Sequence, residues 1–192
     1  MAYYVNHGED NDVEEFWREE RLPYFQEIIL QSNYQPLDRK IYVMYHGTTF
    51  AAAIQIIQKG FKQSEDGMLG RGVYVSRNKD KAARYPLGNQ FDQVILKLRV
   101  NVGKVIAINY QGHPFQKTWH NYGYDTAWVP ASSGMVPSQL EEDCIWDPKR
   151  IKVVGIAYAS QYCITALRNM LVQHDVTLLL LLFLILALLR QL

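Results

Sequence analysis

At 192 residues the chain has the length of one domain with short extensions. Hydrophobic residues make up 48%, and 20 basic residues balance 19 acidic ones, which excludes a disordered chain and a strongly basic nucleic-acid binder. The polar, acidic start argues against a secretory signal. The only two cysteines, Cys144 and Cys163, predict buried thiols in a reducing compartment, so we expect a cytoplasmic protein.

The first elements in chain order are helical and then extended. Apolar residues recur on one face of residues 13–32, which predicts a helix with a kink at Pro23. Residues 41–45 form a β-rich run, and Thr49 is placed to cap a following helix. The predicted buried stripe of that helix consists of Phe50, Ala53, Ile54 and Ile57.

The rest of the chain is dominated by predicted strands. We expect strands at residues 73–75, 94–100, 104–108, 144–146 and 151–158, with a short helix at 78–85 that ends before Pro86. Residues 110–140 are rich in Gly, Pro, Trp and His, which predicts loops with short strands. Strands with short helices inserted between them predict an α+β fold with mixed sheets.

The C-terminal segment differs in kind, because residues 176–189 are uncharged and mostly leucine. As a helix they would span about 21 Å, whereas the hydrocarbon core of a bilayer is about 30 Å thick. Three interpretations stay open: a membrane anchor or interfacial helix, a helix docked on the protein or a partner, and a tail without a function. The predicted organisation is a helical extension over residues 1–35, a main domain over 36–160 and a tail over 161–192.

Several common kinds of site are missing from the sequence. It contains no phosphate-binding loop that ends in Lys-Ser or Lys-Thr, and no dinucleotide fingerprint that opens a long helix. No serine lies in a nucleophile elbow, and the cysteines lack histidines at zinc-ligand spacing. We therefore expect no metal site, and kinase, dehydrogenase and hydrolase functions are disfavoured.

A different set of polar and aromatic side chains is suggestive. His46 and Gly47 follow the first strand, Tyr74 lies inside the strand after a glycine-rich loop, and Glu142 precedes an apolar strand. Taken singly, each residue has an ordinary structural explanation. Their order along the chain, with the strands that carry them, favours a shared site.

Four stretches of the sequence carry a family resemblance. YHGT at 45–48, LGRGVYVS at 69–76, KAARY at 81–85 and EDCIWD at 142–147 resemble the catalytic domain of the poly(ADP-ribose) polymerase superfamily. Longer runs, among them VNVGKVIAINYQGHPFQKTWH and LEEDCIWDP, resemble the interferon-inducible PARP-like proteins first described as grass carp reovirus-induced genes. The resemblance implies an ADP-ribosyltransferase α+β fold with NAD⁺ as substrate.

The resemblance also implies roles for individual residues. His46, Tyr74 and Glu142 would form the catalytic triad, with Glu141 as the alternative acid. The tyrosines Tyr74 and Tyr85 would hold nicotinamide between them, and the glycine loop would let the backbone approach the dinucleotide. The residues expected to bind NAD⁺ are Gly47, Thr48, Gly70, Gly72 and Tyr85.

The implied function is transfer of one ADP-ribose from NAD⁺ to a protein in an interferon-induced antiviral response, without a nucleic-acid partner. Ala82 departs from the family, which often has a serine there that binds the nicotinamide amide. That departure keeps an alternative open, a catalytically silent regulator that binds NAD, ADP-ribose or a partner protein. Phosphate transfer from RNA ends to NAD is a third hypothesis, but we identify no set of Arg and His residues for it. Membrane contact would come through residues 176–189.

Two further clusters are expected to be structural. The short basic cluster of Arg77, Lys79 and Lys81 is predicted to lie on a solvated face. The aromatic residues between Trp119 and Trp128 are predicted to anchor an ordered loop, with a place beside an acceptor site as the alternative.

Overall fold

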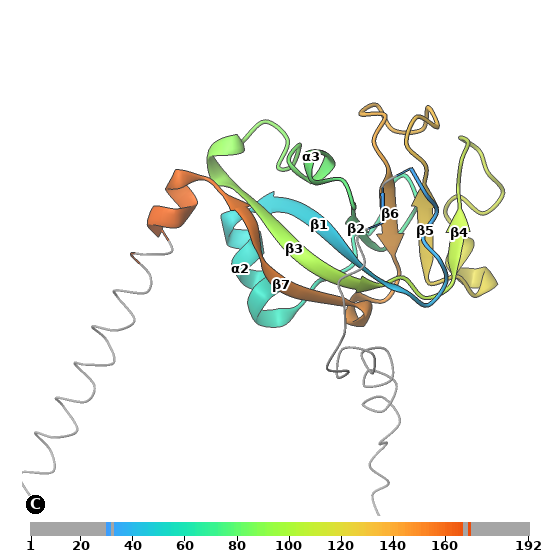
Figure 1. Ribbon diagram of the computed structural model, residues 1–192, viewed down its shortest axis with the longest axis horizontal. Helices are drawn as coiled ribbons and strands as arrows, with labels where there is room; N and C mark the ends of the chain where they lie inside the picture. The colour runs from blue at the N-terminus through green and yellow to red at the C-terminus, as the bar shows by residue number, and fades with distance from the viewer. Residues whose placement is uncertain (1–29, 32, 167–168, 170–192) are drawn as a thin grey trace, which may run out of the picture.

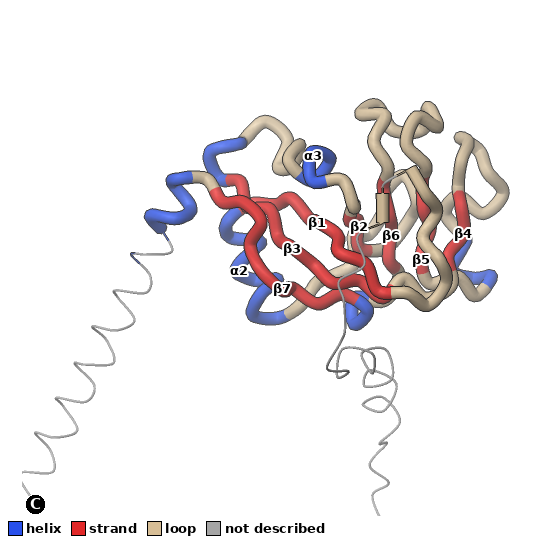
Figure 2. Tube along the Cα trace, viewed as in Figure 1, coloured by secondary structure: helices blue, strands red, loops and turns tan. Residues whose placement is uncertain are grey.

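The computed structural model describes residues 30–31, 33–166 and 169. In this part of the chain two β-sheets lie next to each other, and helices pack against and around them (Figure 1 and Figure 2). Residues 13–29 of the predicted first helix and the apolar residues 176–189 lie outside the described residues. A search of the described helices finds none with the length and hydropathy needed to cross a membrane.

The first sheet has the order β1-β3-β7 and is antiparallel. Its strands are β1 (Ile41–Thr49), β3 (Gln93–Asn101) and β7 (Ile151–Ala159). All three strands were predicted, but β1 is longer than expected. His46 pairs with Leu96 and Gly47 with Ile95, so both residues lie within the strand and not in a turn after it.

The second sheet has the order β2-β6-β5-β4. Its strands are β2 (Val73–Val75), β6 (Glu142–Ile145), β5 (Thr126–Val129) and β4 (Val105–Ala107). The pairing of β4 with β5 is parallel, and the other pairings are antiparallel. β6 begins two residues before the predicted strand, at Glu142 itself, which places that residue in the sheet.

The helices are short. α2 (Phe50–Lys59) begins as predicted, since the Thr49 side chain accepts a hydrogen bond from the Ala52 amide. The predicted buried stripe of α2 is wrong at its last residue, because Ile57 is 48% exposed. Ile56 packs against the core in its place. The other named helical turns are α3 (Lys79–Ala82), η2 (Gln90–Asp92), η3 (Trp119–Tyr122) and η4 (Pro148–Arg150), and residues 161–166 are also helical.

Two apolar clusters hold the sheets in place. The first joins Met44 and Leu96 of the first sheet to Val75 and Ile145 of the second, with Ala53 of α2. The second lies on the opposite face of the second sheet, because successive strand residues point to opposite faces. It includes Leu69, Ala127, Val129, Cys144 and Trp119. Cys144 and Cys163 are buried free thiols, which confirms their predicted packing.

The two sheets meet at one backbone bridge. The Tyr45 amide donates to the Ser76 carbonyl at 2.7 Å, and the Ser76 amide donates to the Tyr45 carbonyl at 3.0 Å. Tyr45 belongs to β1, and Ser76 follows β2 directly. Each residue of the predicted triad therefore lies either in a strand of this junction or in β6 beside it.

Candidate functional site

A cavity of about 360 Å³ opens where the two sheets meet. It is bounded by residues 45–47, 64, 66–68, 74–76, 81–82, 85 and 142. β1 supplies one wall and β2 another, while α3 and the loop before β2 close the sides. Five of the residues expected at the site lie around this cavity: His46, Gly47, Tyr74, Tyr85 and Glu142.

His46 is held in one orientation by the backbone of β2. Its Nδ1 lies 2.8 Å from the Tyr74 carbonyl oxygen, and a carbonyl only accepts, so Nδ1 carries the hydrogen. The Phe61 ring packs edge-on against the imidazole at 5.2 Å between centroids. Burial lowers the pKa of His46 below its ordinary value, so the neutral ring keeps an acceptor lone pair on Nε2.

This lowered pKa has a consequence for stability. Below a pH of about 6.5 the unfolded chain binds a proton at His46 more readily than the folded chain does. Stability is therefore full above that pH and falls as the pH decreases through the folded-state pKa. Replacing His46 with Asn, whose amide can still donate to the Tyr74 carbonyl, should reduce this loss. The loss is the difference between the free energies of unfolding measured with urea at about pH 7.5 and about pH 5.5. An equal loss in wild type and in His46→Asn would contradict a lowered pKa of His46.

Tyr74 has its hydroxyl fully engaged by the glycine-rich loop. The hydroxyl donates to the Gly70 carbonyl at 2.7 Å and accepts from the Leu69 amide at 2.9 Å. A Cβ at Gly67 would lie 2.3 Å from the same oxygen, so only glycine lets the loop come this close. Burial raises the Tyr74 pKa, which keeps the phenol neutral. The loop therefore holds the tyrosine, and the ring is what Tyr74 offers to the cavity.

Tyr85 lies three residues beyond α3, and it is the more open of the two tyrosines. It is 38% exposed, and burial, followed by the charge of Glu142, raises its pKa. The Gln93 side chain donates to the carbonyls of Ala83 and Tyr85, each at 2.7 Å. This fixes the backbone after α3 and with it the position of the Tyr85 ring.

The two candidate acids occupy different places. Glu142 lines the cavity and lies 3.1 Å from Lys81 Nζ through its Oε1 atom. Glu141 is fully buried on the other side of the chain, where its Oε1 accepts from Ser76 Oγ and the Arg77 amide, each at 2.6 Å. Adjacent residues of an extended chain point to opposite faces, so only Glu142 faces the cavity.

The prediction of a solvated basic cluster is confirmed for Lys79, which is exposed, and is wrong for Arg77 and Lys81, which are buried. The side chains of Arg77 and Lys81 are 1% and 6% exposed. Arg77 lies against Glu141 and Asp143, and Lys81 reaches the cavity beside Glu142. Sequence analysis missed Lys81 as a site residue. The sequence does offer one sign of this role. Lys81 directly precedes Ala82, a position that the family motif places beside the nicotinamide.

Three residues expected to bind NAD⁺ are not among those that line the cavity: Thr48, Gly70 and Gly72. Gly70 supplies the carbonyl that accepts from Tyr74. Gly72 lies against Cys144, whose sulfur would be 2.4 Å from an added Cβ. Trp119 and Trp128 are also not among the residues that line the cavity. Both are buried, as expected for anchors, but Trp128 lies in β5 and not in a loop.

The arrangement suits a cationic ring attached to a sugar. Two tyrosine rings can flank the ring, the His46 acceptor can bind a hydroxyl, and the Glu142 carboxylate can stabilise a positive charge that develops nearby. Among the described residues, no group of three or more His, Cys, Asp or Glu side chains is placed to hold a metal ion.

The part of the chain that forms the cavity also matches a known protein family. The family model described as the poly(ADP-ribose) polymerase catalytic domain matches residues 5–149, which is more than half of the chain and includes every residue named for the cavity. A search of curated proteins finds no match.

Proposed function

Because the chain belongs to the poly(ADP-ribose) polymerase catalytic-domain family, whose members use NAD⁺ as substrate, we propose that it transfers a single ADP-ribose from NAD⁺ to a protein. The observation that carries the proposal is the Glu142 carboxylate, which faces one cavity together with His46, Tyr74 and Tyr85.

In the proposed reaction the nicotinamide ring lies against Tyr74 and Tyr85, and the Gly47 backbone binds its carboxamide. His46 Nε2 accepts from a ribose hydroxyl and fixes the pose. The bond between the ribose C1′ and the nicotinamide nitrogen breaks, and its electron pair leaves with nicotinamide. Glu142 accepts a hydrogen bond from the ribose 2′-hydroxyl and stabilises the resulting oxocarbenium-like cation. The acceptor side chain then forms a bond to C1′ and loses its proton.

The test uses NAD⁺ labelled on the adenine or on the nicotinamide, with purified full-length protein. We expect adenine label on protein, free nicotinamide, and single ADP-ribose units by mass spectrometry. Both signals should be lost in Glu142→Ala and His46→Ala. Glu65→Gln is the matched control, because Glu65 is exposed and does not line the cavity. Turnover that survives in Glu142→Ala, or ladders of several units, would contradict the proposal.

A second candidate function is a silent module that binds NAD or ADP-ribose. The observation that favours it is Ala82, which lines the cavity without the hydroxyl that the family often has there. Binding of NAD⁺ by calorimetry with no release of nicotinamide would support the module over the enzyme.

Restoring that hydroxyl gives a separate prediction. In Ala82→Ser the new side chain could bond the nicotinamide carboxamide, and a hydrogen bond between neutral groups contributes about 0.5–1.5 kcal/mol. We expect NAD⁺ to bind about 2- to 10-fold more tightly, measured by isothermal titration calorimetry. Unchanged or weaker binding would mean that nicotinamide does not approach Ala82.

The biological setting is also a proposal and rests on the resemblance to interferon-inducible PARP-like proteins. We propose an interferon-induced antiviral role in the cytoplasm, with membrane contact through residues 176–189. Induction is tested by measuring the transcript in interferon-treated cells. Membrane contact is tested by comparing flotation with vesicles for the full chain and for a chain that ends at His174; equal behaviour would exclude an anchor.

A further inference from the structure

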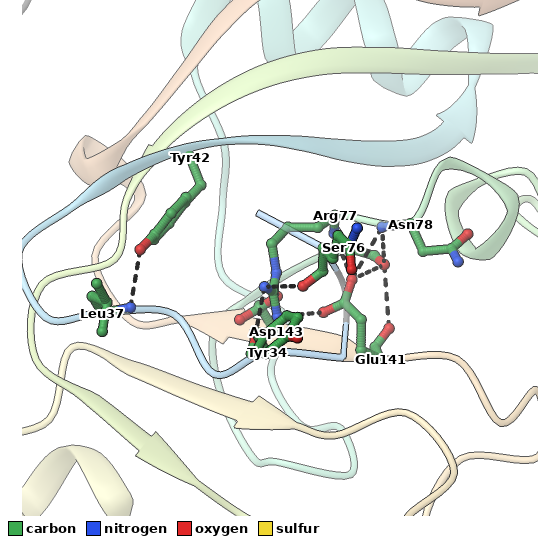
Figure 3. Close-up of polar contacts among 9 residues, drawn as sticks. Tyr34, Leu37, Tyr42, Ser76, Arg77, Asn78, Glu141 and Asp143 are labelled. Carbon is green, nitrogen blue, oxygen red and sulfur yellow. Dashed lines mark hydrogen bonds and ion pairs between the residues drawn. The ribbon is translucent and has the colours of Figure 1, made fainter. Parts of the chain in front are cut away.

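Glu141 connects two parts of the chain that lie on different sides of the cavity. Its Oε1 accepts three hydrogen bonds from consecutive residues, as Figure 3 shows: from Ser76 Oγ at 2.6 Å, from the Arg77 amide at 2.6 Å and from the Asn78 amide at 3.1 Å. These three residues form the junction between β2 and α3. The carboxylate is fully buried, so water does not compete for these donors.

The junction determines where α3 begins. The Asn78 side chain caps the helix, because its Oδ1 accepts from the amides of Asp80 and Lys81 at 2.8 and 3.2 Å. The Asn78 amide donates to Glu141 Oε1 and, at 3.0 Å, to Ser76 Oγ, which itself donates to Glu141, and Asn78 holds the first turn. A chain of hydrogen bonds therefore runs from the residue before β6 to Lys81.

This series of hydrogen bonds ends at β6, because Lys81 Nζ lies 3.1 Å from Glu142 Oε1. Glu141 and Glu142 are neighbours that point to opposite faces. One short segment thus fixes the start of α3 with one carboxylate and places the other carboxylate in the cavity.

The far end of α3 is fixed separately. Gln93 of β3 donates to the carbonyls of Ala83 and Tyr85, and neither contact involves Glu141. Loosening the start of the helix would therefore shift Lys81 relative to Glu142 and leave Tyr85 in place.

We propose that Glu141 is a positioning residue, which sets the start of α3 so that Lys81 and Glu142 are held in register for the transfer reaction. This inference rests on the proposed function. Glu141 then affects the rate at which bound NAD⁺ reacts. Gln93, which positions Tyr85, affects how tightly NAD⁺ binds.

The deciding variants separate geometry from charge. Glu141→Asp keeps the charge but withdraws the carboxylate by about 1.5 Å, one carbon–carbon bond, so it cannot reach all three donors. Glu141→Gln keeps the length and an acceptor oxygen. We expect kcat to fall about 10- to 100-fold in Glu141→Asp, with KM for NAD⁺ changed less than about threefold, and Glu141→Gln to stay within about threefold of wild type.

Two further variants serve as comparisons. Asp143 is also buried beside Arg77, and burial together with the neighbouring Glu141 raises its pKa. Asp143→Asn should therefore leave kcat and KM within about threefold of wild type. Gln93→Met removes the donor at the other end of α3, so it should raise KM for NAD⁺ and change kcat little.

Hydrogen exchange provides a readout without turnover. In Glu141→Asp the amides of residues 78–82 should exchange faster, while those of β3 stay as in wild type. Unchanged exchange in α3, an unchanged kcat, or equal losses in Glu141→Asp and Glu141→Gln would overturn the proposal. Wild-type protein that binds NAD⁺ without turning it over would overturn the proposed function instead, and the exchange pattern would still decide whether Glu141 holds α3.

Discussion

Replacing Glu142 with Gln should lower kcat for NAD⁺ cleavage by about 100- to 1,000-fold and leave NAD⁺ affinity within about threefold. The substitution keeps the shape of the side chain and removes its charge. Positive charge develops on the ribose only as nicotinamide leaves, so the carboxylate stabilises the transition state more than the bound substrate. Single-turnover rates and calorimetric affinities, measured on the same preparation, separate the two effects.

Lys81 complicates this substitution, because its side chain is only 6% exposed and Glu142 is its anionic partner. Removing one member of a buried pair typically costs about 3–5 kcal/mol of stability. The double variant Glu142→Gln with Lys81→Met removes both charges, so it should recover most of the lost stability. It should not recover turnover, since the carboxylate is still missing.

The two results together distinguish a structural from a chemical role. If stability and kcat return together in the double variant, Glu142 acts by holding Lys81 and α3, and not on the ribose. A single variant that keeps more than about a tenth of the wild-type kcat would also contradict the assignment.

The strands that carry the candidate residues could be predicted because their patterns are local, whereas the roles of those residues came from the family resemblance. Tyr74 is surrounded by valines after a glycine-rich loop, and His46 precedes a glycine near the end of an apolar run. Such patterns report strands and close backbone contacts directly. The glycine-rich loop also binds the Tyr74 hydroxyl, a contact that no periodicity encodes.

Other features depend on tertiary packing and were out of reach. The resemblance favoured Glu142 over Glu141, but strand pattern alone could not decide between them, because a shift of one residue in the start of β6 reverses the face to which each side chain points. Charged residues such as Arg77 and Lys81 are expected at the surface unless paired. Their partners lie in β6 or directly before it, more than 60 residues later in the chain, so the sequence offers no local sign that these two side chains are buried.

Replacing Gly47 with Ala should lower the free energy of unfolding by about 1–3 kcal/mol and remove detectable NAD⁺ binding. An added Cβ would lie 1.8 Å from the Ala82 carbonyl oxygen and 3.0 Å from that of Tyr85. These are backbone atoms, so no rotamer change relieves the clash, and α3 must move away from β1. Gln93 resists that movement, because it holds the Tyr85 carbonyl.

The displacement of α3 would also carry away Lys81, Ala82 and Tyr85, which line the cavity together. Gly155→Ala is the matched control, because a Cβ at Gly155 of β7 meets nothing within 4 Å and its φ is not positive. It should change the free energy of unfolding by less than about 0.5 kcal/mol and leave NAD⁺ binding intact. Denaturant unfolding and calorimetry measure both properties. A Gly47→Ala protein with wild-type stability would show that β1 and α3 are not in this close contact, and the cavity geometry on which the proposed function depends would then be wrong.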